Sequence, residues 1–256
     1  MPERDDISAT TPQQIQEAPA LTQGERLLYT FIAPSKTFTD ILRSASWWLP
    51  FLVMAVVVYG YLFAIQRQVG WDTVATNISR HEGRAPEQMP NASSQRTDRI
   101  HTITIAIVKG TLWGYPVIIL IVNAVAALVL LGTINLLFNG KANFACVFAV
   151  CTYSLLPRVF SALISSVALF LGMGRETFYL NNPLGTNVGY YLSSDSPSWL
   201  VALGNSLDIL TIWCLALIAI GLAIVAKVNK AFGFITVFGW ALILLSARVA
   251  ISGLRI

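Results

Sequence analysis

"GTLWGYPVIILIVNAVAALVLLGTINLLFNGKAN", residues 110–143, is the stretch that decides the fold. It contains no Asp, Glu, Lys or Arg between Lys109 and Lys141, and most of its side chains are aliphatic. A helix needs ~20 apolar residues to cross the ~30 Å of hydrocarbon in a bilayer. This stretch is long enough, so it predicts a membrane-spanning helix that ends in a short basic turn.

The same test applied to the whole chain of 256 residues finds further spans on both sides of this stretch. Helices are expected because lipid offers backbone groups no partner outside their own helix. The composition agrees, with 12% charged residues, against roughly 25% in a typical soluble domain. We predict an all-α integral membrane bundle of five transmembrane helices within residues 24–252, with spans at about 46–66, 111–138, 143–172, 199–226 and 231–252.

The turns between spans predict how the helices pair. "NGKAN" (139–143) and "KVNK" (227–230) are short, so each predicts an antiparallel hairpin, and the span order places both turns on one face of the membrane. Lys141, Lys227 and Lys230 lie in these turns, which are on the same face as the N-terminus. Short basic loops mark the cytoplasmic side. The pattern therefore favours a cytoplasmic N-terminus.

Two further segments lie outside the spans. Residues 1–23 have few large apolar side chains, which is typical of a disordered tail. Residues 24–50 show apolar side chains at helical spacing in two groups separated by Pro34, which predicts two short amphipathic helices. These helices either lie on the membrane surface or pack against the protein's own loops. In the long link 67–110, the isoleucines near its end indicate a helix that runs into the second span.

The sequence carries no recognisable catalytic or cofactor motif. Zinc-protease, phosphate-loop, nucleophile-elbow and dinucleotide patterns are all missing. Both histidines, His81 and His101, lie in the 67–110 link, and Asp208 is the only acidic residue within a predicted span. We therefore expect no enzyme activity, no catalytic residue, no cofactor and no metal site. The cations are scattered, so no nucleic-acid partner is expected either.

Polar residues within the spans are the candidate site. At ~1.5 Å per residue, one from each span lies roughly 22–27 Å from the face that carries the short turns. An unpaired charge at mid-helix costs at least ~3 kcal/mol, so these side chains are expected to face inward together. The candidate layer consists of Tyr61, Asn123, Arg158, Asp208 and Arg248.

Two interpretations of this layer stay open. Asp208 accepts hydrogen bonds from Arg158, Arg248 or both, and the surplus positive charge holds a lipid phosphate or another anion. Alternatively, Arg158 pairs with Asp208 only to fix helix packing, while Arg248 reaches the membrane interface. Pro157 fits both, because it frees a backbone carbonyl one turn earlier that a neighbouring donor can use.

Several motifs together resemble a known family. They are "FIAPSKTFTDI" (31–41), "WWLP" (47–50), "YSLLP" (153–157), "NPLGTN" (182–187) and "LDILTIWCLALIAIGL" (207–222). In this order they are similar to a bacterial member of the Yip family, the Ypt/Rab-interacting-protein membrane domain, over roughly residues 25–252. The resemblance implies five transmembrane helices, a cytoplasmic N-terminus and an exoplasmic C-terminus. Tyr153 and Pro157 match its third-span motif as structural positions, not catalytic ones.

The resemblance also shapes what we expect of function. Eukaryotic relatives are linked to Rab GTPases, Golgi membranes and vesicle traffic, and no catalytic activity defines the family. This chain has a short N-terminal extension without an evident GTPase-docking element, so a Rab partner is not expected.

We expect a non-enzymatic membrane organiser or scaffold with a lipid-binding role, located in a bacterial inner (plasma) membrane. Its expected partners are membrane lipids, anionic ones included, and other membrane proteins or a second copy. The alternative is a small transporter or lipid-handling protein that uses the layer of Arg158, Asp208 and Arg248.

Overall fold

The computed structural model describes residues 19–81, 94–172, 174–180, 183–193 and 196–254. Within these residues, five helical segments are long and apolar enough to cross a membrane, as the sequence predicted. The spans are α3 (Trp48–Gln68), α6 (Tyr115–Phe138), α7 with α8 (Phe144–Ser154 and Pro157–Phe170), α10 (Ile209–Ala226) and α11 (Lys230–Gly253).

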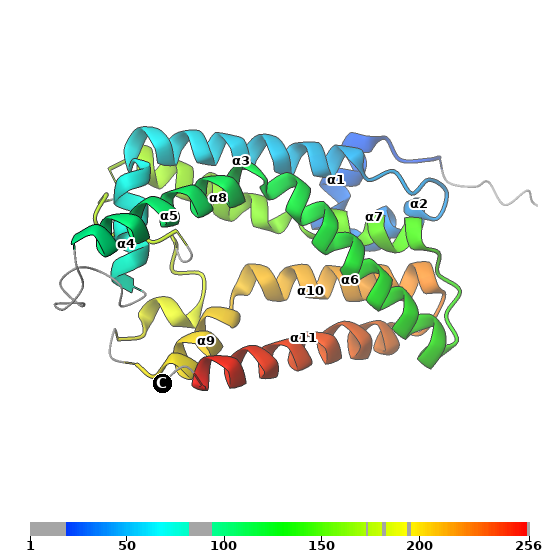
Figure 1. The fold of residues 1–256 in the computed structure, drawn as a ribbon. Helices are drawn as coiled ribbons and strands as arrows, with labels where there is room; N and C mark the ends of the chain where they lie inside the picture. The colour runs from blue at the N-terminus through cyan, green and yellow to red at the C-terminus, as the bar shows by residue number, and fades with distance from the viewer. Residues whose placement is uncertain (1–18, 82–93, 173, 181–182, 194–195, 255–256) are drawn as a thin grey trace, which may run out of the picture.

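The two short turns lie together at one end of the bundle. α6 pairs with α7 and α10 pairs with α11, and Figure 1 shows both turns at the end where the N-terminal helices lie. The backbone N–H of Lys141, in the first turn, donates to the carbonyl of Ala226, beside the second, at 3.0 Å. Asn139 and Lys227 adopt left-handed backbone conformations that end α6 and α10. The predicted placement of both turns on one face is confirmed.

The N-terminal helices α1 (Gln23–Ile32) and α2 (Pro34–Ile41) are amphipathic, as predicted. α2 packs against α7 and α10, and Phe38 and Ile41 are fully buried in the core of the bundle. Their apolar faces therefore contact the spans themselves, which neither predicted alternative described. Leu28 and Ile32 of α1 remain exposed at 57% and 66%. The expected disordered tail falls, for residues 1–18, outside the described residues.

The core is divided between the two ends of the bundle. The larger cluster fills the half near the short turns and centres on Phe38, Val147, Tyr153 and Leu222, each with no or almost no exposed surface. A smaller cluster joins the end of α3 to α4, to the end of α8 and to Phe178 in the following loop, at the opposite end. Dense packing of the first half leaves no room there for a ligand or water.

The long first link is helical where the structure describes it. α4 (Trp71–His81) and α5 (Ser94–Trp113) pack together at the end opposite the short turns, and α5 leads into α6 with a break at Gly114 (Figure 1). The predicted helix that runs into the second span is thus confirmed.

Two spans differ from their predicted bounds. The third span is interrupted at Leu155 and Leu156, between α7 and α8. The fourth, predicted as 199–226, is divided at Leu207 and Asp208 into α9 (Ser198–Ser206) and α10. A short 3₁₀ turn (Val188–Tyr191) packs against α9. Each break carries polar residues or a proline (Asn205, Ser206 and Asp208 at the second, Ser154 and Pro157 at the first), but these are too few to interrupt a charge-poor run of the length used to predict the spans.

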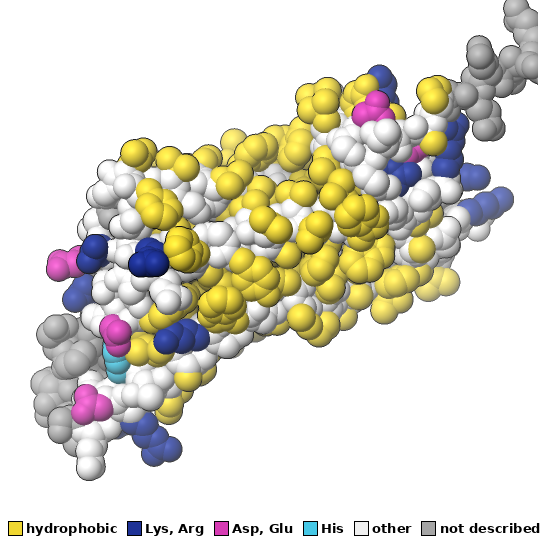
Figure 2. Space-filling model, turned by 90° about the horizontal axis from the view of Figure 1, so that it is seen from above, with side chains coloured by type: hydrophobic (Ala, Val, Ile, Leu, Met, Phe, Trp, Pro, Cys, Tyr) yellow, Lys and Arg dark blue, Asp and Glu magenta, His cyan; other side chains and the backbone are white. Residues whose placement is uncertain are grey.

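The outer surface has the distribution expected of a membrane protein. Figure 2 shows hydrophobic side chains over the middle of the molecule, with Lys, Arg, Asp and Glu gathered at its two ends. Large apolar side chains are exposed along α3, α6 and α11. In a bilayer these apolar side chains contact lipid tails, so no protein partner is required to cover them.

Candidate functional site

The break in the third span places a cation in the middle of the bundle. Pro157 lacks the N–H that would bond the carbonyl of Tyr153, and Leu156 N–H donates to that carbonyl instead, at 3.1 Å. The chain then restarts as α8 with Pro157 in its first turn. A neighbouring donor was expected to be able to use the freed carbonyl, and the N–H of Leu156, in a tight local turn, does so. Arg158 therefore lies in the first turn of α8.

A second helix start faces Arg158. Asp208 is the N-cap of α10, and its Oδ2 accepts from the backbone N–H of Thr211 at 2.8 Å and from the Thr211 hydroxyl at 2.7 Å. Arg158 donates from Nη2 to the same hydroxyl at 3.1 Å. Thr211 therefore links the guanidinium to the carboxylate.

The predicted direct bond between Arg158 and Asp208 is not formed. In the part of the chain that the structure describes, the only ion pair joins Arg26 to Asp40. The Asp208 carboxylate turns toward its own helix because an N-cap must accept the free N–H groups of the first turn. Arg158 therefore keeps most of its hydrogen-bonding capacity, and its side chain is exposed.

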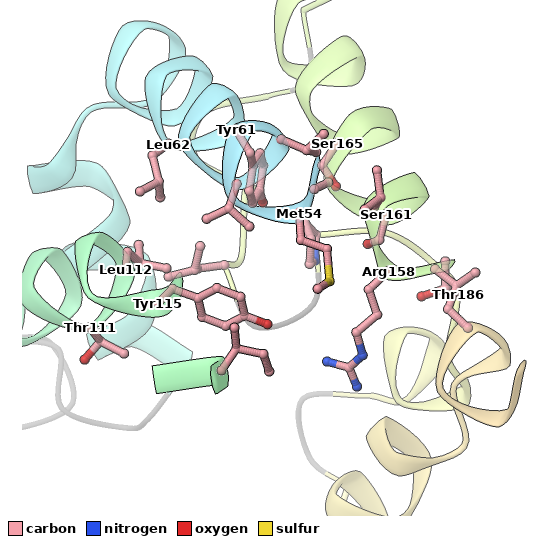
Figure 3. A pocket seen from close by; sticks show the side chains of 18 of the residues that line it. Met54, Tyr61, Leu62, Thr111, Leu112, Tyr115, Arg158, Ser161, Ser165 and Thr186 are labelled. Carbon is pink, nitrogen blue, oxygen red and sulfur yellow. The ribbon is translucent and has the colours of Figure 1, made fainter. Parts of the chain in front are cut away.

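Arg158 and Asp208 line a cavity of about 700 Å³, which we call the Arg158 cavity. One wall is largely apolar and comes from α3, α5 and α6, with Met54, Leu112 and Ile119 among its residues. The opposite wall comes from α8, α10 and the loop before α9, and it carries most of the polar groups. Figure 3 shows Arg158 extending from α8 into this space, with Tyr115 pointing into it from α6. The cavity is thus amphipathic.

Two buried hydroxyls in the cavity lie beside each other without well-formed hydrogen bonds. The Tyr61 hydroxyl and Ser165 Oγ interact with each other, but neither makes a hydrogen bond of good geometry to a residue that the structure describes. Figure 3 shows both side chains at the cavity, from α3 and α8 respectively. A buried polar group without a partner costs ~1–3 kcal/mol, so an acceptor is expected to occupy this part of the cavity. Tyr61 was predicted from its depth, whereas Ser165 was not among the candidate residues.

The other two members of the predicted layer lie elsewhere. Asn123 is buried between α6 and α7, where its side-chain amide donates to Thr152 Oγ1 at 2.8 Å. Arg248 is exposed on α11, donates to Ser206 Oγ at 3.2 Å and lines a separate hollow beside α9. Depth along a helix does not fix the direction of a side chain around it. The predicted single network of five residues is therefore wrong, and three of them share the Arg158 cavity.

Some important residues were not predicted. Thr211 could have been found, because Asp208 followed three residues later by Thr211 resembles the start of a helix. The ion pair of Arg26 and Asp40 lies outside the spans, where charge carries no signal of burial. Tyr153, predicted as a structural position, is fully buried and donates from its hydroxyl to Gln23 Oε1 at 3.1 Å. It thereby fixes the start of α1 to the third span.

No metal centre is built from the described residues, since no three His, Cys, Asp or Glu side chains among them gather closely enough. The three cysteines, Cys146, Cys151 and Cys214, are buried as free thiols.

These features define an integral membrane protein with five helical spans and an internal amphipathic cavity. The model of the Yip1 domain matches residues 28–251, so the chain belongs to the Yip family. Comparison with curated proteins gave no match, and comparison with solved structures gave none either.

Proposed function

We propose that this protein is a non-enzymatic membrane organiser that holds a phospholipid in the Arg158 cavity, with the lipid phosphate against the Arg158 guanidinium. The observation that carries the proposal is an arginine in the middle of a membrane bundle whose nearest described partner is a hydroxyl, at 3.1 Å, and not a carboxylate. A wholly unpaired charge at such a depth costs at least ~3 kcal/mol, and Asp208, which reaches Arg158 only through the Thr211 hydroxyl, offsets this cost in part. A phosphate offers a guanidinium the paired, charge-assisted hydrogen bonds that would offset this cost.

The dimensions of the cavity support a lipid. Its volume of about 700 Å³ falls within the ~300–1,000 Å³ typical of ligand pockets. The apolar wall of α3, α5 and α6 suits acyl chains, while the adjacent hydroxyls of Tyr61 and Ser165, which lack well-formed hydrogen bonds, suit acceptors such as ester carbonyls or water. One ligand with a charged head, a polar linkage and a tail would satisfy all three features.

A small transporter is the second candidate, and the packing weighs against it. A transported molecule needs a route toward both membrane faces. The half of the bundle near the short turns is filled by the core around Phe38 and Tyr153, neither of which has exposed surface. A protein that holds a lipid needs only one opening into its cavity. The dense packing of the half near the short turns therefore favours lipid binding over transport across the membrane.

The same proposal covers location and partners. We place the N-terminus on the cytoplasmic side of a bacterial inner membrane because the short turns with Lys141, Lys227 and Lys230 lie at that end. The proposed partners are membrane lipids, anionic ones included. Contacts with other membrane proteins, or with a second copy, belong to the organiser role.

Native mass spectrometry of the purified protein tests lipid binding. The wild type, extracted in mild detergent, is expected to retain phospholipid, and Arg158→Met is expected to lose it. Arg248→Met is the matched control, because it removes an exposed intramembrane arginine that lies outside the Arg158 cavity. Equal retention by all three proteins would contradict the proposal.

A double variant separates ligand binding from packing. If Arg158 and Asp208 serve packing alone, Arg158→Met with Asp208→Leu is expected to leave the lipid content unchanged, although loss of the α10 N-cap should lower the melting temperature. Under the proposal, the double variant keeps its fold, as judged by size-exclusion chromatography and circular dichroism, but no longer retains phospholipid.

A further inference from the structure

We propose that the lipid held in the Arg158 cavity carries a primary ammonium group beside its phosphate, as phosphoethanolamine headgroups do. This inference rests on the proposed function and names the class of headgroup. It follows from the presence of both charge signs at the polar end of the cavity, where Arg158 and Asp208 are both lining residues.

The two charges are close but do not neutralise each other directly. Arg158 Nη2 and Asp208 Oδ2 bind the same Thr211 hydroxyl, at 3.1 and 2.7 Å, so they lie no further apart than these two bonds laid end to end. They do not form an ion pair, since the one found among the described residues is that of Arg26 and Asp40. A phosphate and an ammonium joined by a short two-carbon linker present the complementary pair of charges at a similar spacing.

The Asp208 carboxylate has capacity for a cation. Both of its hydrogen bonds from Thr211 use Oδ2, and Oδ1 accepts none from a residue that the structure describes. A purely anionic headgroup on Arg158 would bring a second negative charge close to this carboxylate, which costs free energy in a site of low dielectric. An ammonium group beside the phosphate removes that repulsion and can donate to Oδ1.

The lining near Asp208 favours a primary ammonium over a quaternary one. Asn187, which pairs with Asp208 in a β-bridge, and Thr211, which donates to its carboxylate, both line the cavity, and neither is aromatic. Quaternary ammonium groups cannot donate hydrogen bonds and are recognised by cages of aromatic rings. A primary ammonium donates three hydrogen bonds, and carboxylate, amide and hydroxyl oxygens accept them.

The apolar wall identifies the source of this headgroup as a lipid and not a free metabolite. Residues such as Met54, Leu112 and Ile119 offer no polar contact to a soluble phosphoethanolamine. They offer an acyl chain a dry surface, so binding is expected to require the tail.

Nanodiscs of defined composition test the headgroup. The protein is placed in equimolar phosphatidylethanolamine, phosphatidylglycerol and phosphatidylcholine with identical acyl chains, released into mild detergent, and analysed for retained lipid by native mass spectrometry. We expect the wild type to retain phosphatidylethanolamine about tenfold over each of the others, the factor that one hydrogen bond to a charged group supplies. Excess soluble phosphoethanolamine is expected not to displace the lipid.

Asp208→Asn is the diagnostic variant. Asparagine also caps helices well, so α10 is expected to keep its start while the carboxylate charge is lost. The variant should still retain phospholipid but lose its preference for phosphatidylethanolamine over phosphatidylglycerol. Arg158→Met should retain none.

The outcomes separate the two proposals. Equal or greater retention of phosphatidylglycerol by the wild type would overturn the ammonium inference and leave the lipid-holding function standing. If Asp208→Asn kept the full preference for phosphatidylethanolamine over phosphatidylglycerol, the ammonium inference would also be overturned, and the lipid-holding function would still stand. Failure of the wild type to retain any phospholipid would overturn both, and displacement by soluble phosphoethanolamine would overturn the assignment to a lipid.

Discussion

Arg26 donates from Nε to Asp40 Oδ2 at 2.7 Å, and the two side chains are only 3% and 6% exposed. The guanidinium also donates to the backbone carbonyl of Ser44 at 2.8 Å, and Asp40 Oδ1 accepts from Leu21 N–H at 3.3 Å. One ion pair thereby joins α1, α2 and the linker into α3. It holds the N-terminal helices against the end of the bundle where the short turns meet.

Breaking this pair from one side should be costly. Arg26→Met leaves the Asp40 carboxylate buried without its cation, which is expected to lower the free energy of unfolding by about 3–5 kcal/mol. Arg26→Met with Asp40→Leu removes both charges and should recover much of that loss. Thermal unfolding in detergent, followed by circular dichroism, measures both. If the double variant were no more stable than the single one, burial of an unpaired charge would not be the cause.

Close packing of α10 on α11 depends on Gly233. A Cβ at this position would press against the Ala219 carbonyl oxygen and lie 2.9 Å from Ala223 Cβ, whereas a Cβ at Gly239 would meet nothing within 4 Å. Gly233→Ala is therefore expected to lower the free energy of unfolding by about 1–3 kcal/mol. Gly239→Ala, on the same helix, should leave it unchanged or raise it by up to ~1 kcal/mol. A similar loss of thermal stability in both variants would count against this account.

The start of α1 should be sensitive to acid. Glu25 Oε2 accepts from the Thr22 backbone N–H and from the Thr22 hydroxyl, both at 2.8 Å, and these bonds lower the pKa of the Glu25 carboxyl. A lowered pKa in the folded protein means that the stabilisation is complete above the ordinary carboxyl pKa and is lost as the pH falls through the lowered one. The contribution is small because Glu25 is fully exposed.

The test measures the melting temperatures of the wild type and of Glu25→Ala from neutral pH down to a pH below the lowered pKa of the Glu25 carboxyl. The wild type is expected to melt higher near neutral pH, and the difference should vanish in acid. Glu176→Ala removes an exposed carboxylate from the other end of the molecule and serves as the control. A difference that persists below the lowered pKa would show that the charge of Glu25 is not involved.

Membrane orientation can be read from chemical labelling. The native cysteines are all buried, so the wild type should react little with a maleimide that does not cross membranes. In spheroplasts, Tyr191→Cys, whose position is 75% exposed, should be labelled from outside. Lys141→Cys, in a short turn, should be labelled only after the membrane is opened. The reverse pattern would place the N-terminus outside the cell.

The number of spans and the pairing of hairpins could be predicted because both depend on local features. A charge-free run of sufficient length must cross as a helix, and a turn such as 139–143 leaves its helices no choice but to be antiparallel. The insertion of α2 into the core could not be predicted in this way. It depends on Phe38 meeting Gly221 and Val150, which are far away in the sequence.

The site was only partly predictable because depth and direction are separate properties. Tyr61, Arg158 and Asp208 share both, and they line one cavity. Asn123 and Arg248 share the depth alone, since each turns toward a different pair of helices. The direct pairing of Arg158 with Asp208 failed for a local reason. The carboxylate caps α10, and Thr211 occupies the position between the two charges.

The hydrogen bond from Lys141 to Ala226 has a mechanical consequence. It clamps the two hairpins to each other at their turns, so relative movement of the hairpins must pivot there and grow with distance from that end. The Arg158 cavity lies beyond the clamp, between α6 of one hairpin and α10 of the other. A small rotation about the joined turns would therefore widen the Arg158 cavity, while the end of the bundle where the short turns meet stays closed.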